Sequence, residues 1–300
     1  MSIPINRARV FCEGLDHPEG LAVHPDGSIW AGGEAGQIYR IAPDGQQIDQ
    51  VADTGGFVLG IAFSPGAEWL AVCDLKLGCL WRLDPATGRL EKLADRVDGQ
   101  PLRVPNHVSF ADDGTLYLSD SGNPKQNDGT LLRFDADDPT RGALWHAGPF
   151  HFANGTALDP TQRWLYVAVS FLPGVERVAI RDDGSAGARE LVATLPDTVP
   201  DGLAFDAVGR LYVSCYTPNR IYRIMPDHRS ELFIEDMDAH TLCNPTNLAF
   251  GGVGLNDLFT SNLGRWHLTH IDADIPGHPL ASHRQGQAAA PPPPRSRETV

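Results

Sequence analysis

The stretch Val199-Pro200-Asp201-Gly202-Leu203-Ala204-Phe205 decides the fold, together with residues 206–214 that follow it. It has the form of a short apolar strand, a glycine-containing turn and a second strand with an aromatic residue in it. The same phrase occurs six times, and its copies begin at equivalent first positions: Glu19, Leu59, Asn106, Asn154, Asp201 and Thr246. Successive copies lie 40 to 48 residues apart. This period in an all-β pattern predicts a six-bladed β-propeller with four antiparallel strands in each blade.

The last copy of the repeat lacks a fourth strand. After a strand expected over residues 267–272, the chain continues with Ile275-Pro276-Gly277 and a polar tail. The segment Ala8-Arg9-Val10-Phe11-Cys12 can supply the missing strand, so we expect the N-terminus to close the ring and remove an exposed sheet edge. The propeller is then expected to span residues 1–280, and the Pro- and Ala-rich residues 281–300 to form a disordered tail.

Composition excludes several classes of function. The formal charge of -14 argues against nucleic acid or an anionic membrane as partner. The N-terminus lacks the apolar run of a signal peptide, and no stretch approaches the roughly 18 apolar residues of a membrane span. We therefore expect a cytoplasmic protein, a monomer or weak homodimer. The five cysteines have no framework spacing and are expected to be reduced, although Cys73 and Cys79 flank a hairpin and could face each other.

Four of the six first positions carry side-chain oxygen: Glu19, Asn106, Asn154 and Asp201. Because the positions are equivalent, these side chains should lie at one height around the axis. Two carboxylates in a crowded channel are costly unless something compensates their burial, and a divalent cation would do so. The set contains neither Cys nor His, which favours Ca²⁺, Mg²⁺ or Mn²⁺ over a structural zinc site. The alternative is a polar, water-filled channel in which these side chains form hydrogen bonds to one another.

The same residues carry a resemblance to a known family. Pro18-Glu19-Gly20, Asn106, Asn154-Gly155 and the stretch from Asp201 to Phe205 resemble the SMP-30/gluconolactonase/luciferin-regenerating-enzyme family of six-bladed propellers, up to about residue 280. The resemblance implies that Glu19, Asn154 and Asp201 bind one divalent metal and that Asn106 contacts the metal or the substrate. Calcium is the expected ion, with Mg²⁺, Mn²⁺, Zn²⁺ and Fe²⁺ as alternatives.

The resemblance also implies an activity: hydrolysis of a sugar lactone, an aldonolactone such as gluconolactone. The metal would polarise the lactone carbonyl, and Asp201 would either act as general base or hold the attacking metal-bound water. Two other functions stay open. One is the hydrolysis of organophosphates or other esters at the same metal, and the other is a non-enzymatic propeller that binds a peptide or protein.

Three loop residues are candidates for substrate binding. Several sugar lactonases of the family carry a substrate-binding Arg two residues before the position that Asn106 occupies in this chain. Val104 stands at that place here, and Arg103 lies one residue further back. Asp120 is either a turn cap or a substrate ligand, and His151 is either a surface histidine or a substrate contact.

Other polar residues of the repeat are expected to be structural. His107 follows Asn106 on the same strand, so its side chain should point away from the axis. Ser109, Ser119 and Ser214 lie near strands but outside any G-x-S-x-G elbow, which disfavours a serine hydrolase.

Overall fold

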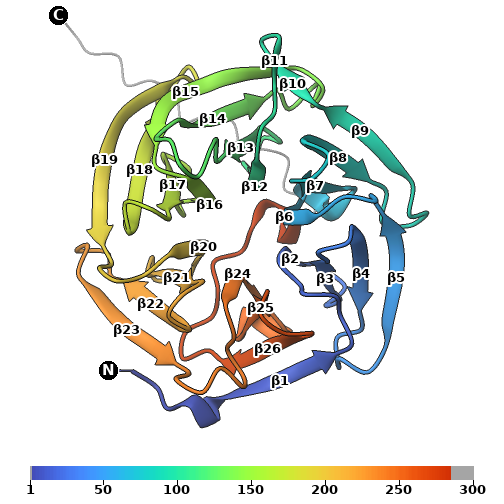
Figure 1. Ribbon diagram of the computed structural model, residues 1–300, viewed down its shortest axis with the longest axis vertical. Coiled ribbons are helices and arrows are strands. Elements are labelled where there is room, and N and C mark those ends of the chain that lie inside the picture. Colours follow the sequence, from blue (N-terminus) through green and yellow to red (C-terminus); the bar gives the residue numbers. More distant parts are fainter. Residues whose placement is uncertain (1, 285–300) are drawn as a thin grey trace, which may run out of the picture.

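The computed structural model describes residues 2–284 and consists of six four-stranded antiparallel sheets arranged as blades around a central axis (Figure 1). This confirms the predicted six-bladed propeller. From the channel outward, the first three blades are formed by β2 (Leu21–Val23), β3 (Ile29–Gly32), β4 (Gln37–Ile41) and β5 (Ile48–Asp53); by β6 (Val58–Phe63), β7 (Leu70–Asp74), β8 (Cys79–Leu83) and β9 (Leu90–Ala94); and by β12 (Pro105–Phe110), β13 (Leu116–Asp120), β14 (Gly129–Phe134) and β15 (Gly142–Phe150).

Blades 4 and 5 follow the same order, with β16 (Ala153–Leu158), β17 (Trp164–Val169), β18 (Gly174–Ile180) and β19 (Ala186–Thr194), then β20 (Pro200–Phe205), β21 (Leu211–Cys215), β22 (Arg220–Ile224) and β23 (Ser230–Glu235). Smaller elements lie between blades or at strand ends: the hairpin β10 (Arg96–Val97) and β11 (Gln100–Pro101), and the 3₁₀ turns η1 (Ile5–Arg7), η2 (Pro65–Ala67), η3 (Val253–Leu255) and η4 (Ala281–His283).

Blade 6 takes its outer strand from the opposite end of the chain. It consists of β24 (Pro245–Gly251), β25 (Asp257–Asn262), β26 (His267–Asp272) and β1 (Ala8–Glu13). β1 pairs antiparallel with β26 from Ala8 opposite Ile271 to Glu13 opposite His267. The predicted closure of the ring by the N-terminal strand is confirmed, and it covers an edge that would otherwise be unpaired.

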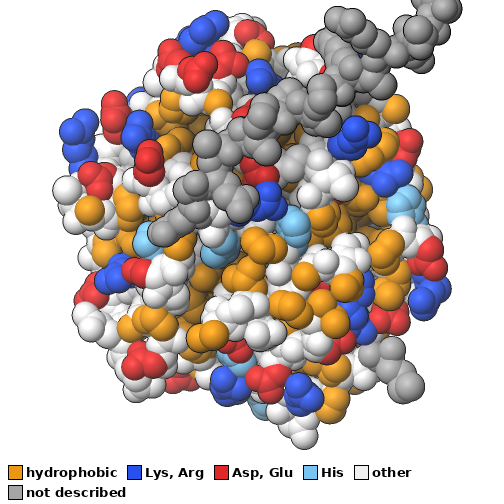
Figure 2. Space-filling view, turned by 180° about the vertical axis from the view of Figure 1, so that it is seen from behind, with side chains coloured by type: hydrophobic (Ala, Val, Ile, Leu, Met, Phe, Trp, Pro, Cys, Tyr) orange, Lys and Arg blue, Asp and Glu red, His pale blue; other side chains and the backbone are white. Residues whose placement is uncertain are grey.

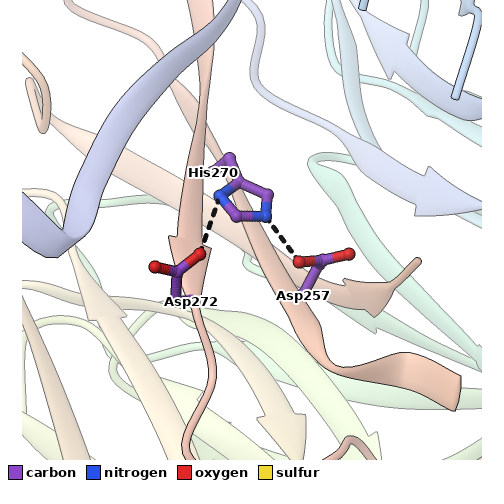
Figure 3. Close-up of side chains that lie close together, drawn as sticks. All are labelled: Asp257, His270 and Asp272. Atoms are coloured by element: carbon purple, nitrogen blue, oxygen red, sulfur yellow. Dashed lines mark hydrogen bonds and ion pairs between the residues drawn. The ribbon is translucent and has the colours of Figure 1, made fainter. Parts of the chain in front are cut away.

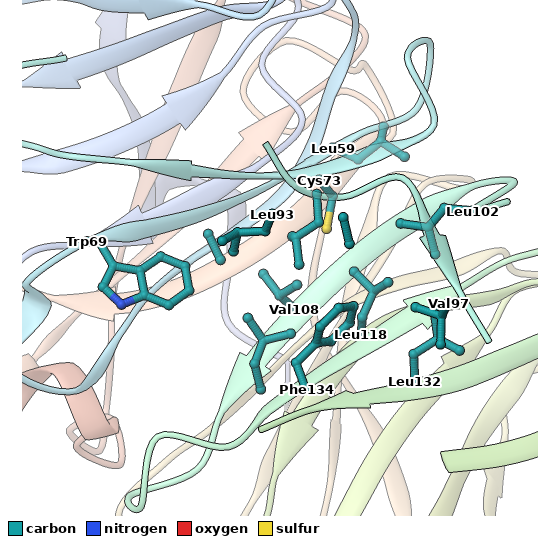
Figure 4. Close-up of a cluster of buried hydrophobic side chains, with 14 residues drawn as sticks. Leu59, Trp69, Cys73, Leu93, Val97, Leu102, Val108, Leu118, Leu132 and Phe134 are labelled. Carbon is teal, nitrogen blue, oxygen red and sulfur yellow. The ribbon is translucent and has the colours of Figure 1, made fainter. Parts of the chain in front are cut away.

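The apolar core lies between blades. Each of six buried clusters joins two neighbouring blades, and the cluster between blades 2 and 3 packs Trp69 and Cys73 against Leu118 and Phe134 (Figure 4). A single blade therefore cannot bury its own apolar faces, and the closed ring folds as one unit. The five cysteines are free thiols, and Cys73 lies opposite Leu80 rather than Cys79.

The chain after β26 crosses the end of the channel. Gly277 forms a bridge with Asp206 of blade 5, and the His278 N–H donates to the Phe205 carbonyl at 2.9 Å. Ala281 is buried, and Arg284 forms an ion pair with Asp112 of blade 3. Residues 281–284, expected to begin the tail, are instead packed on the propeller, because the small side chains of Ala281 and Ser282 are buried there and Arg284 is held by Asp112. The rest of the expected tail, residues 285–300, lies outside the described residues.

The surface carries charges of both signs. Seen from behind (Figure 2), acidic and basic side chains lie mainly toward the rim, while apolar and histidine side chains gather nearer the middle. Among residues 2–284 there is no helix of the length and apolarity that a membrane crossing requires.

Candidate metal centre

The four polar first positions lie where the innermost strands begin. Glu19 stands two residues before β2, and Asn106, Asn154 and Asp201 are each the second residue of β12, β16 and β20. All four are buried, with exposed fractions of 4–6%. The fold thus brings four polar residues from four blades to one end of the channel, as the repeat predicts.

A β-bulge re-aims the chain at these positions. In blade 5, Asp201 and Gly202 of β20 lie opposite the single residue Ser214 of β21. The pairing shifts at the equivalent place in blades 2, 3, 4 and 6. An extra residue bends the strand and changes which side chains face the channel.

Serine side chains fix several of these bulges. The Gly202 N–H donates to Ser214 Oγ at 2.9 Å, and the Ser214 hydroxyl donates to the carbonyl at the first position of blade 6. In the same way, Ser119 Oγ accepts from the His107 N–H at 3.1 Å and Ser261 Oγ accepts from the Asn247 N–H at 3.0 Å. The carbonyl groups that they hold in the next blade belong to candidate ligands, Asn154 at 2.7 Å and Glu19 at 2.7 Å. Ser119 and Ser261 thus hold the backbone of two candidate ligands in place.

Glu19 and Asp201 are two acids buried together. Burial raises the pKa of Asp201 to about 7, and a hydrogen bond from Asn154 acts in the opposite direction. Burial also raises the pKa of Glu19 well above its usual value, and the charge of Asp201 raises it further. No basic side chain in the described part of the chain contributes to either shift. Two buried carboxylates without a cationic side chain between them favour a bound cation.

The free oxygen atoms suit that cation. Asp201 Oδ1 is buried and has no hydrogen-bond partner among residues 2–284. Asn154 donates through Nδ2 to Ser170 Oγ at 3.1 Å and also to Asp201, which leaves its Oδ1 as an acceptor. With the Glu19 carboxylate, these atoms supply the oxygen ligands that Ca²⁺ and Mg²⁺ prefer. The residues present therefore fit a divalent cation.

The other first positions differ in character. Asn106 is buried, and its side chain makes no hydrogen bond within the described residues, so its carboxamide is free to contact a metal or a substrate. Thr246 Oγ1 donates to the Glu19 carbonyl at 3.0 Å and is occupied there. Leu59 is apolar and packs in the core between blades 2 and 3.

Two of the three predicted substrate contacts have other partners. The Asp120 carboxylate accepts from backbone N–H groups at 2.9–3.1 Å, including that of Arg103, and so acts as a turn cap. The Arg103 guanidinium forms an ion pair with Asp128 and donates to its carbonyl at 2.7 Å. His151 is partly exposed and packs against Phe171, with ring centroids 5.6 Å apart. Only His151 of the three keeps a side chain without a polar partner among the described residues.

His107 has the opposite orientation to the one expected. Its Nδ1 accepts from the Thr156 N–H at 3.2 Å, and its ring bonds Asn247 of blade 6, across the channel. The prediction that this side chain points away from the axis is wrong, because the bulge between Pro105 and His107 changes the alternation of the strand. Burial lowers the pKa of His107 to about 4, although the bond to Asn247 raises it, so the ring is neutral at pH 7.

A cavity lies in the other half of the channel. It has a volume of about 110 Å³, and residues 278–283 close its far side. Its walls include one small residue from the equivalent position of each innermost strand: Ala22, Ala62, Ser109, Ala157, Ala204 and Ala249. None of the four candidate ligands lines it. His107 lines this chamber and contacts Asn247, so these two residues separate it from the metal centre.

A second cluster of acids and histidine lies on blade 6 (Figure 3). His270 Nε2 lies 2.6 Å from Asp257 Oδ1, and His270 Nδ1 lies 3.8 Å from Asp272 Oδ1. The two carboxylates thus approach opposite nitrogens of one ring, and one possible ligand atom from each of the three residues lies within 4.8 Å of the others. Arg9 of β1 contacts both Asp272 and His270, at 3.4 Å each. The cluster fastens the closing strand to its blade.

Comparison with known proteins identifies the family. The model of a family described as "SMP-30/Gluconolactonase/LRE-like region" matches residues 52–263, more than half of the chain. The chain belongs to this family. The predicted resemblance is confirmed, and a strictosidine synthase-like N-terminal model also matches residues 9–41 of this SMP-30/gluconolactonase-like protein.

Individual relatives of the SMP-30/gluconolactonase-like chain are distant. It is 28% identical over 254 residues to 6-deoxy-6-sulfogluconolactonase of Pseudomonas putida, covering 78% of each chain. It is 26% identical over 285 residues to STRICTOSIDINE SYNTHASE-LIKE 6 of Arabidopsis thaliana, covering 89% of this chain and 70% of that one. Its fold matches that of regucalcin from Agrobacterium tumefaciens, described as a calcium-binding protein, with a TM-score of 0.74, 16% identity and coverage of 91% and 97%.

Proposed function

We propose that this protein is a metal-dependent lactonase that hydrolyses a sugar lactone, such as gluconolactone. Membership of the SMP-30/gluconolactonase-like family and the similarity to a sulfogluconolactonase support lactone hydrolysis. Metal dependence is supported by the pair of buried acids, Glu19 and Asp201. Among the described residues, Asp201 Oδ1 has no hydrogen-bond partner. Glu19, Asn154 and Asp201 hold the ion in this proposal. The all-oxygen donor set favours calcium, which the regucalcin neighbour is also described as binding.

Asp201 is the group that handles the proton. A bound divalent cation would polarise the lactone carbonyl and stabilise negative charge on its oxygen. Asp201 accepts a proton from water as the water oxygen bonds to the carbonyl carbon. The bond between that carbon and the ring oxygen then breaks, and the proton passes to the ring oxygen to give a hydroxy acid. Because Asn154 bonds to Asp201, it fixes the direction in which the carboxylate presents its free oxygen.

Asn106 and His151 contact the substrate in this proposal. Asn106 lies in the ring of first positions with a free carboxamide, which can bind a lactone oxygen or a sugar hydroxyl. His151 lies beside Phe171 in the loops before β16 and after β17. Asp120 and Arg103 are left out, because their polar atoms are engaged within their own loops.

The test combines metal analysis with a substrate panel. Protein purified without chelator is expected to contain about one divalent ion per chain and to open sugar lactones, with acid release followed by pH-stat. Loss of turnover in chelator and its return with Ca²⁺, Mg²⁺ or Mn²⁺ would support the metal. Organophosphates or simple esters hydrolysed faster than every lactone would replace the proposed substrate. Absence of bound metal, together with no hydrolysis at all, would favour a non-enzymatic binding propeller.

A further inference from the structure

The layer directly beneath the candidate ligands is unusual in composition. The residues that follow the six first positions are Gly20, Gly60, His107, Gly155, Gly202 and Asn247. A side chain at Gly60 would lie 2.5 Å from His107 Cδ2, and one at Gly202 would lie 2.7 Å from Asn247 Cα. The glycines therefore leave room for just two side chains, from opposite blades 3 and 6. We call His107 and Asn247 the axial pair.

Hydrogen-bond chemistry fixes the orientation of the axial pair. The Thr156 backbone N–H can only donate, so the His107 Nδ1 that it contacts at 3.2 Å is an acceptor. The neutral ring therefore carries its proton on Nε2. In the side-chain hydrogen bond between His107 and Asn247, the amide oxygen therefore accepts that proton, and Asn247 Nδ2 is left to face the other way. That nitrogen lies 3.3 Å from Glu19 Oε2 and 3.0 Å from the Glu19 carbonyl oxygen.

Blade 6 thus determines the position of Glu19 in blade 1. The Glu19 carbonyl accepts three bonds from blade 6: from Asn247 Nδ2 at 3.0 Å, from Thr246 Oγ1 at 3.0 Å and from Ser261 Oγ at 2.7 Å. Only the Asn247 amide also reaches the Glu19 carboxylate among the described residues. Asn247 itself is buried, with 3% of its surface exposed, so a lost hydrogen bond there is not replaced by bulk water.

We propose that Asn247 is a positioning residue that orients the Glu19 carboxylate toward the ion, and that His107 acts through Asn247 by holding its amide from across the axis. The inference rests on the proposed metal centre but concerns residues outside it. Partners of metal ligands commonly change metal affinity by about 10–100-fold when they are removed, because a free carboxylate must be ordered on binding.

The experiment measures calcium affinity by isothermal titration in four variants. Asn247→Leu keeps the branched shape of the side chain and removes its hydrogen bonds to Glu19 and His107, and we expect its Ca²⁺ affinity to fall by about 10–100-fold. His107→Leu should weaken binding by a smaller factor, and His107→Gln, which restores a donor toward Asn247, should recover part of that loss. The double variant Asn247→Leu/His107→Leu should bind no more weakly than Asn247→Leu alone, because residues in one network are not additive.

Asn262→Ala is the matched control. Asn262 is also a fully buried Asn of blade 6, with bonds to Cys243, His267 and Thr269 at 2.9–3.2 Å, but it does not contact Glu19. Its removal should lower the melting temperature while leaving the Ca²⁺ affinity within about twofold of the parent protein. Equal losses of affinity in Asn262→Ala and Asn247→Leu would reduce Asn247 to a general stabilising role and overturn the inference.

Crystal structures without added metal keep the two proposals separate. Glu19 should hold one rotamer in the parent protein and turn or lose order in Asn247→Leu. If the parent protein binds no divalent ion, the proposed metal centre is refuted. The Glu19 rotamer then tests by itself whether Asn247 positions the carboxylate. An unchanged Glu19 in Asn247→Leu, together with unchanged Ca²⁺ affinity where binding occurs, would refute the positioning role.

Discussion

Glu19 and Asp201 are buried close enough together that the charge of Asp201 raises the pKa of Glu19. They belong to blades 1 and 5, which are separated by blade 6, so no single sheet holds them together. Their separation is set by the closed ring and by the bonds from blade 6 to Glu19. Because each carboxylate disfavours ionisation of the other, the stability of the ion-free protein depends on pH.

The first prediction concerns stability in chelator. The pKa of Asp201 is raised to about 7 in the folded protein, from 3.8 as its ordinary value. A pKa that folding raises stabilises the folded state at every pH below the pKa of the unfolded state. This contribution is lost as pH rises from about 4 through about 7. A shift of this size corresponds to about 4 kcal/mol. Unfolding free energies between pH 4 and pH 8 in chelator should fall with pH, and saturating Ca²⁺ should restore much of the loss. In Asp201→Asn the slope should become shallower, and an equally steep slope there would contradict this account.

The second prediction separates metal binding from proton transfer at Asp201. Asp201→Asn keeps the shape and one carbonyl oxygen, but an amide cannot accept a proton as a base at neutral pH. We expect kcat on a sugar lactone to stay reduced by about 10²–10⁴-fold at saturating metal. Recovery of the full rate by excess metal would remove Asp201 from the chemistry and leave it only the role of a ligand.

The third prediction concerns Asn106. Asn106→Ala should raise KM more than it lowers kcat, because we place its free carboxamide beside the substrate and away from the path of the proton. The measurement is initial rates over a range of lactone concentrations, with metal titrated for the variant. A large fall in kcat with little change in KM would instead show that Asn106 takes part in the chemical step and contradict this placement.

The fourth prediction concerns the strand that closes the ring. A chain that begins at Glu13 lacks nearly all of β1, and with it the pairing to β26 and the contacts of Arg9. We expect its melting temperature to fall by about 10 °C or more, since the blade-to-blade core is shared. A chain that begins at Ile5 is the control, because it keeps all of β1 and loses the bond from Ile3 to the Phe233 carbonyl, the bond from Arg7 to the Pro4 carbonyl and the apolar contact of Ile3. Similar melting temperatures for both chains would show that closure by β1 is dispensable.

The fifth prediction concerns the C-terminal segment. Removal of residues 278–300 opens the chamber and discards the buried Ala281 and the ion pair of Arg284. Melting should occur several degrees lower, whereas removal of residues 285–300 alone should leave it unchanged. Turnover should persist in both, because the axial pair separates the chamber from the metal centre. Loss of turnover in the longer deletion at a temperature where the chain is folded would contradict this separation.

The sequence by itself determined the propeller, the closure of its ring and the four polar first positions. Each of these follows from the repeat. Equivalent residues of equivalent blades must lie at equivalent places around the axis, so Glu19, Asn106, Asn154 and Asp201 can be grouped without knowing a single contact. The missing strand of the last copy likewise predicts that Ala8 and its neighbours complete it.

Only the tertiary structure decided how the polar side chains outside that ring are used. His107 faces the axis because a one-residue bulge changes the alternation of its strand, and Asn247 meets it from the opposite blade. Asp120 caps a turn and Arg103 pairs with Asp128 because loop geometry brings those groups within hydrogen-bond reach. A repeat encodes what its copies share. Where single copies depart from it, the outcome depends on contacts between residues that are distant in the sequence, and those contacts exist only in the folded ring.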